Sequence, residues 1–192
     1  MHESEVMGQP ALQSFTESDE EATLREAGVP QEQRRPTQAN NRVMVELVWL
    51  GVHRGALTYR ARRDALGAES PDAAAGRLAG LEPASPPPTV LHSTSWRYEH
   101  GQVVLTYAAA CDPDPGRGRA LRPVTTAHSG DLLAPSPPVV TLTQVAAHAC
   151  RHLALLHATD TRVVAVAVGA PQFWDLITAY GVAPAGALIT RP

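Results

Sequence analysis

The chain has no lysine, only two cysteines and few aromatic residues, and each scarcity narrows the interpretation. All 16 basic residues are arginines, and aromatic residues make up 5% of the 192 positions. A chain rich in arginine, alanine and proline but without lysine is typical of G+C-rich coding sequence, so we expect a bacterial protein. Two cysteines cannot form the disulfide framework of a small secreted domain. Reduced thiols and a cytoplasmic location are therefore expected.

Long apolar segments are also missing. The N-terminus, Met1–Glu5, has neither the basic nor the apolar region of a signal peptide. No uninterrupted apolar run reaches the length of about 18 residues that a membrane-spanning helix needs. We therefore expect no membrane contact.

The negative charge is concentrated at the N-terminus. Residues 1–41 carry eight acidic residues and three arginines, a net charge of −5, which leaves +2 for the rest of a chain whose total is −3. Neither value is basic enough for a typical nucleic-acid-binding protein. Because residues 1–41 are polar and almost free of aromatics, we predict a disordered acidic tail there and a single α+β domain over 42–192.

Two β-hairpins are predicted within that domain. In the first, the β-rich segment Val43–Leu50 and the alternating segment Leu57–Arg62 flank a turn at residues 53–55. In the second, Val90–Glu99 and Gln102–Ala110 flank His100-Gly101, a plausible tight turn.

The two-residue turn predicts the register of the second hairpin. Four cross-strand pairs are expected on one apolar, core-facing side: Tyr98 with Val103, Trp96 with Leu105, Thr94 with Tyr107, and His92 with Ala109. The residues between them, Ser93, Ser95 and Arg97, are expected on the opposite side.

Helices are predicted between and after the hairpins. Ser70 as N-cap, Pro71 at the first position and Gly80 as C-cap predict a short helix. Thr141 and Gln144 have the spacing of a capping box.

The capping box opens a helix over Leu142–His157, and another short helix is expected over Gln172–Tyr180. The β-branched segment Val163–Val168, which Asp160 can cap, fits either a helix or a strand.

The stretch Glu69–Leu81 carries a spacing found in one protein family. Glu69 is followed by seven residues and then Arg77, and the stretch ends Gly80-Leu81. In this it resembles the box of Nudix proteins. That box places three carboxylates after the arginine, where this chain has none, and the usual Gly-rich run before the box is reduced to Gly67.

The resemblance implies an architecture and a restriction on chemistry. It implies a Nudix-like mixed or antiparallel sheet of hairpins packed with the box helix and C-terminal helices, over roughly residues 43–157. In Nudix hydrolases the box arginine orients catalytic carboxylates, and here Arg77 would lack them. Glu69 alone cannot hold Mg²⁺, because protein-bound Mg²⁺ is coordinated by several oxygen ligands. An active Nudix hydrolase is therefore not expected, and no catalytic residue is assigned.

Four residues are candidates for ligand binding. Arg97 could bind a phosphate or carboxylate and Trp96 could stack on a ring. Arg60 and Arg77 lie on neighbouring elements of the expected fold, so all four are predicted near one pocket. The alternatives are a well-packed hairpin with an aromatic core face for the segment that carries Trp96 and Arg97, and a solvated edge-strand face for Arg54, Arg60, Arg62 and Arg63.

A pair of histidines suggests a metal site that the sequence alone does not complete. His148 and His152 are four residues apart and project from one side of a helix, as helical zinc ligands do. A site would need His92, His128 or an acid to converge on them. The alternative is that both histidines rim the core, so we expect no metal and no cofactor.

Three functions remain open. The first is a non-catalytic Nudix-like domain that binds a nucleotide-like or other anionic metabolite. The second is a protein–protein module or homodimer that uses the C-terminal helices and the aromatic residues Phe173, Trp174 and Tyr180. The third is a hydrolase whose site uses histidines.

Overall fold

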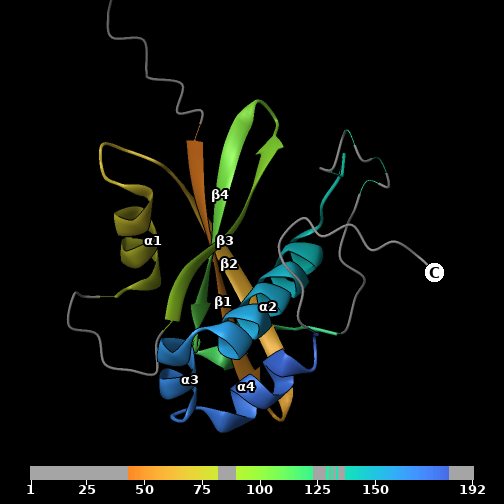
Figure 1. Ribbon diagram of the computed structural model, residues 1–192. Helices are drawn as coiled ribbons and strands as arrows, with labels where there is room; N and C mark the ends of the chain where they lie inside the picture. Colours follow the sequence, from red (N-terminus) through yellow and green to blue (C-terminus); the bar gives the residue numbers. More distant parts are fainter. Residues whose placement is uncertain are drawn as a thin grey trace, which may run out of the picture. The chain divides into compact units, whose positions relative to one another are not determined.

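A five-stranded mixed sheet forms the centre of the fold, with strand order β3-β4-β1-β2-β5 (Figure 1). The computed structural model describes residues 43–81, 90–122, 129, 131, 133 and 137–181. The predicted acidic tail over 1–41 lies outside these residues. In chain order the elements are β1 Val43–His53, β2 Ala56–Ala65, α1 Pro71–Ala79, β3 Val90–Glu99, β4 Gln102–Ala110, the 3₁₀ turn η1 Pro115–Arg117, β5 Arg119–Ala120, α2 Leu142–Thr159, α3 Thr161–Ala167 and α4 Pro171–Thr178.

Both predicted hairpins are confirmed, and their turns explain why they form. The turn residues Arg54 and Gly55 have φ of 52° and 78°, and His100 and Gly101 have φ of 50° and 81°. Two consecutive positive φ values match the twist of the flanking strands. The hairpins join through parallel pairing of β1 with β4. The predicted α+β class is therefore confirmed.

The sheet is covered on both faces by different helices (Figure 1). Alternate residues of β1 point to opposite sides, as the period of a strand requires. Leu47 and Trp49 pack with α1, whereas Val48 and Leu50 pack with α2, α3 and α4. We call these sides the α1 face and the α2 face. Burial on both faces explains why β1 is an almost continuous apolar run.

The helix caps follow the sequence. The Ser70 side chain accepts a hydrogen bond from the Ala73 amide, and Gly80 ends α1 with φ of 68°. Thr141 and Gln144 form the predicted capping box of α2, which extends two residues beyond the predicted end, to Thr159.

The undecided segment after Asp160 is a helix, α3. The side chain of Asp160 accepts from the Arg162 amide, and Val163 and Ala167, four residues apart, are buried on one side of the helix. α4 begins one residue earlier and ends two residues earlier than predicted. No helix of the described segments is long and apolar enough to cross a membrane.

The predicted register of the second hairpin holds only near its turn. Tyr98 pairs with Val103 and Trp96 with Leu105, as expected. Beyond a β-bulge between Ser93 and Ser95, the prediction is wrong by one residue.

In this half of the hairpin Ser93, rather than Thr94, pairs with Tyr107, and Leu91, rather than His92, pairs with Ala109. The extra residue, Thr94, is buried, and its hydroxyl donates to the Thr106 carbonyl at 3.3 Å. A bulge leaves one residue unpaired and shifts the register that follows.

The predicted burial is also wrong for two of the three hairpin aromatics, whereas the third, Tyr107, is buried. Trp96 is 67% exposed and Tyr98 is 71% exposed. Both lie on the α1 face towards the hairpin turn, whereas the residues of α1 pack further along the sheet, against Leu47, Trp49 and Tyr107. Alternation assigns these aromatics to one face correctly, but it does not reveal where the covering helix ends.

Candidate interaction surface

The four predicted ligand-binding residues do not converge. Arg60 and Trp96 share the α1 face but lie on β2 and β3, which two strands separate. At about 4.8 Å per strand this is roughly 14 Å. Arg97 follows Trp96 in the same strand and so points to the α2 face. Arg77 lies on α1 and contacts Asp64, at the end of β2.

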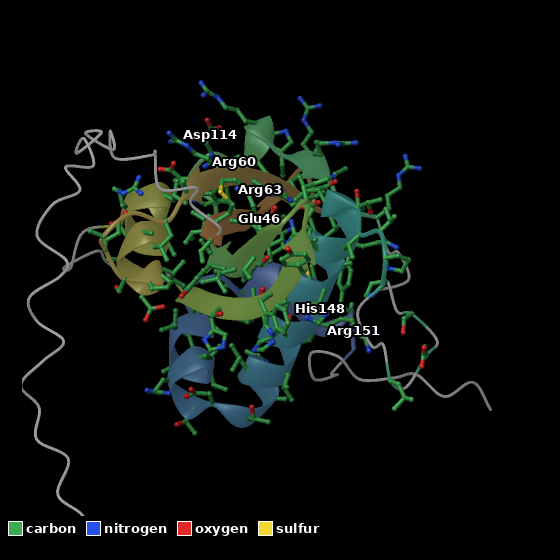
Figure 2. All side chains as sticks on the ribbon, turned by 90° about the horizontal axis from the view of Figure 1, so that it is seen from above. Glu46, Arg60, Arg63, Asp114, His148 and Arg151 are labelled. Carbon is green, nitrogen blue, oxygen red and sulfur yellow. The ribbon has the colours of Figure 1, made fainter. Side chains whose placement is uncertain are left out.

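Arg97 belongs to a charged network around a buried carboxylate on the α2 face. Glu46, on the central strand, is 1% exposed. Arg97 donates to its two oxygens at 2.8 and 3.0 Å, and the Thr106 hydroxyl donates at 3.2 Å. Arg63 donates to Glu46 and, at 2.7 Å, to Glu99. Figure 2 shows Glu46 and Arg63 beside each other on the sheet.

The electrostatics of this network favour the ionised form of Glu46. Burial opposes ionisation, but the hydrogen bonds and positive charges of Arg97 and Arg63 outweigh it and hold the pKa of Glu46 below its usual value. Two arginines and two carboxylates balance in charge. The guanidinium of Arg97 therefore serves as the counter-charge of a buried carboxylate within the protein.

Arg60 anchors the segment after β4. Its guanidinium donates to both oxygens of Asp112, at 2.8 and 2.7 Å, and lies 4.1 Å from the ring centre of Trp49. The Asp112 side chain is 1% exposed. A bidentate pair stacked on an aromatic ring is a favourable arrangement for arginine. This pair fixes the start of the η1 segment on the α1 face.

Arg77 binds the residue that stands eight positions before it. Its Nη2 donates to Glu69 at 2.7 Å, and its Nη1 donates to Asp64 at 3.1 Å. The spacing that resembles the Nudix box therefore forms an exposed ion-pair cluster that ties α1 to the end of β2. All three predicted ligand-binding arginines thus have carboxylate partners within the chain.

An apolar patch remains on the α1 face, next to the β3–β4 turn. Trp96 and Tyr98 project from β3, and the half-buried Leu105 and Val103 lie opposite them on β4. Val43 of β1 continues the row beside Val103. We call these five residues the aromatic patch. It contains no charged side chain, and its two largest members are its most exposed.

The patch borders an unpaired strand. β3 ends the sheet on this side, and no strand in the described ranges pairs with its outer edge. Within these ranges, the backbone groups on that edge have no strand partner, which makes the edge a site where another strand can pair. Exposed aromatic side chains beside an open strand edge are the features by which peptide-binding sheets recognise extended segments.

The C-terminal aromatics do not form the surface that the sequence suggested. Phe173 and Trp174 are each 3% exposed, and their rings meet edge-on at 5.3 Å. Tyr180 is half-buried, and its hydroxyl donates to the Leu121 carbonyl at 3.4 Å. These residues belong to the core under α2. In the described part of the chain these three side chains therefore supply no exposed apolar surface, and a protein–protein contact through the C-terminal helices stays a prediction.

In the described part of the chain, the side chains that commonly bind metal ions are not clustered into a site. Within the residues that the structure describes, no three histidine, cysteine, aspartate or glutamate side chains are placed to hold a metal ion. Cys111 and Cys150 are free thiols, and burial raises the pKa of both. His92 does approach His152, with ring centres 5.0 Å apart.

Sequence reasoning missed Glu46 and Asp112. A signal for Glu46 was present, since it is the one charged residue within the apolar run 43–50, and a charge there needs a partner. Asp112 gave no such signal, because it lies among the turn-forming residues 112–115.

Comparison with known proteins identifies no relative of this chain. No family model, no curated protein and no solved structure matches this chain.

Proposed function

We propose that this chain is a non-catalytic protein-interaction module that binds an extended segment of a partner protein along the edge of β3. The observation that carries the proposal is the exposure of Trp96 and Tyr98 on a strand with an open edge. Tryptophan and tyrosine are the residues that most often supply binding energy at interfaces. Leaving both in water would be unfavourable in a domain that had no use for them.

The patch indicates what the partner segment must look like. A strand added beside β3 presents alternate side chains to the two faces of the sheet. Those on the α1 face would meet the uncharged aromatic patch, so they should be apolar. Those on the α2 face would lie near Arg97 and Glu99, so they should be polar. We therefore expect a segment that alternates apolar and polar residues.

A partner segment fits β3 better than a second copy of β3 does. The bulge at Thr94 leaves Ser95–Glu99 as the regular stretch next to the turn. In a symmetric antiparallel pair both copies would bring a bulge, so only a few residues could pair regularly. A two-fold axis at Arg97 would also place two arginines opposite each other, which is destabilising. A regular foreign strand avoids both problems.

A displayed library of random twelve-residue peptides tests the proposal. The wild-type chain should enrich peptides with alternating apolar residues, and synthetic copies should shift the backbone amide resonances of β3. The double variant Trp96→Ser/Tyr98→Ser should bind these peptides at least about tenfold more weakly, the loss expected when one or two anchor residues are truncated. Because both side chains are exposed, the melting temperature should change little.

The matched control is Val168→Ser, which removes an apolar side chain that is 80% exposed on the other face. It should bind the peptides as the wild type does. Enrichment that survives the double variant would refute the proposal. The proposal would also be refuted if sedimentation equilibrium showed a wild-type dimer that the double variant Trp96→Ser/Tyr98→Ser does not form. The patch would then serve self-association.

Binding of an anionic metabolite by a Nudix-like domain stays a prediction. For Arg60, Arg77 or Arg97 to take part, each would first have to leave a carboxylate at less than 3.2 Å. A thermal-shift screen with nucleotides and sugar nucleotides, with and without Mg²⁺, separates the two functions. A shift that Arg97→Gln abolishes would favour the metabolite over the peptide.

A further inference from the structure

Three histidines from two distant parts of the sequence lie between β3 and α2. His92 lies on β3, and its ring centre is 5.0 Å from that of His152 on α2, with the planes tilted by 42°. His148 lies one helical turn before His152, so it projects from the same side of α2. Figure 2 labels His148 on this helix. We call His92, His148 and His152 the histidine cluster.

The cluster is poorly supplied with hydrogen-bond partners. Nε2 of His148 and Nδ1 of His152 are buried and have no partner in the described part of the chain. One ring has a compensating contact, since His148 forms a hydrogen bond with the backbone of Thr94. Buried polar atoms without partners are rare in folded proteins and invite an explanation.

The charged groups that face the cluster do not neutralise an added proton. Asp160, the N-cap of α3, acts on His92, but its carboxylate is held by Arg162 at 2.7 and 3.1 Å. Arg151, on α2 itself, repels positive charge on His148. For His152, the charges that oppose protonation are those of His92 and His148.

On balance, the surroundings of the three rings favour neutral imidazoles. Burial lowers the pKa of His92, His148 and His152. For His148 the Thr94 hydrogen bond opposes this effect in part, whereas Arg151 adds to it. For His152 its two neighbours add to it. The folded state therefore binds protons at the cluster less readily than the unfolded chain does.

We propose that the histidine cluster is a proton-sensitive latch, which holds α2 on β3 when its rings are neutral and releases the middle of α2 from β3 when they gain protons. Two or three positive charges within one packed contact repel each other, and among the residues that the structure describes no free carboxylate acts on the cluster to offset them. The latch lies at the back of the strand whose outer edge we propose as the docking site. It depends on its own contacts and stands whether or not that edge binds a partner.

The direction of the pH dependence follows from the lowered pKa values. Histidines in the unfolded chain bind protons below about pH 6.5. The cluster contributes its full stability above that pH, and the contribution is lost as the pH falls through this value and on through the lower pKa of the folded state. The stability that the cluster contributes should therefore begin to fall under mild acid.

Melting temperatures at pH 7.5 and pH 5.5 test the proposal. The wild type should lose more stability on acidification than the double variant His92→Gln/His152→Gln, in which glutamine keeps a polar side chain but cannot titrate. The expected difference is about 3 °C or more for a domain of this size. His53→Gln, which alters an exposed histidine of the β1–β2 turn, should behave as the wild type does.

Hydrogen exchange of the full chain supplies a readout that needs no variant. After correction for the intrinsic rates, the amides of β3 and of the α2 segment that bears the cluster should lose protection at pH 5.5, while those of β1 keep theirs. Equal acid sensitivity of wild type and double variant would overturn the latch. The latch would also be overturned if Zn²⁺ at pH 7.5 stabilised the wild type but not the double variant. The cluster would then be a metal-binding site.

Discussion

At the scale of single residues, the buried charges of this protein are neutralised by ion pairs with opposite charges in the same chain. Glu46 is the most demanding of them, since a carboxylate at the centre of a sheet is costly unless it is paired and hydrogen-bonded. It has three donors, from Arg63, Arg97 and Thr106. Its lowered pKa means that this contribution to stability persists at neutral pH and is lost only as the pH falls through the pKa of the folded carboxyl.

Replacing Glu46 with glutamine should destabilise the fold by about 3 kcal/mol, because the change leaves the guanidinium of Arg97 largely buried without its counter-charge. Urea denaturation measures the loss. Glu69→Gln is the matched control, since its ion pair with Arg77 is exposed and should contribute less than about 1 kcal/mol. Equal effects of the two substitutions would contradict the assigned role of Glu46.

At the scale of elements, two glycines of the box-like segment have opposite roles. Gly76 lies within α1, whereas Gly80 ends the helix in a left-handed conformation with φ of 68°. A Cβ added at either position would meet nothing within 4 Å. The changes in stability caused by alanine at these two positions therefore reflect backbone conformation rather than steric contacts.

Gly76→Ala should stabilise the protein by about 0.5–1 kcal/mol, because alanine loses less conformational freedom in a helix. Gly80→Ala should destabilise it by about 1 kcal/mol, because a Cβ disfavours the left-handed region. The melting temperatures of the two variants should therefore move in opposite directions. A shift of both in the same direction would mean that α1 does not end at Gly80.

The elements also show how far sequence reasoning reaches. The hairpin turns, the helix caps and the capping box were predicted correctly because each depends on a few neighbouring residues. The register beyond Thr94 and the exposure of Trp96 were not, because they depend on where distant elements pack. For the candidate site, Trp96 was named from sequence, but the edge position of β3 requires the whole sheet order.

At the scale of the whole molecule, the core divides into two layers on either side of the sheet. The larger layer lies beneath α2, α3 and α4 and contains Cys150, whose side chain is fully buried. Burial strongly raises the pKa of this thiol, so the reactive thiolate is scarce in the folded state. Access to Cys150 should require the opening of that layer as a unit.

A thiol reagent such as Ellman's reagent should therefore modify Cys150 at least about 1000-fold more slowly in the native protein than in urea, as expected for a site reached through global unfolding. Peptide mapping should find Cys111, which is half-buried, labelled first. Labelling of Cys150 at a rate close to that of an exposed thiol would show that the helices detach from the sheet locally.

The two edges of the sheet differ, and this difference sets a limit on assembly. The edge formed by β2 is partly covered by β5 and by the Leu121 amide, which donates to Leu57 at 2.8 Å. Further along β2 lies the exposed Arg62, and charged side chains on an edge strand discourage the approach of another strand. Within the described residues, the edge of β2 thus does not match the edge of β3. A complex formed at the edge of β3 is expected to close with one segment per chain, rather than to propagate into a filament.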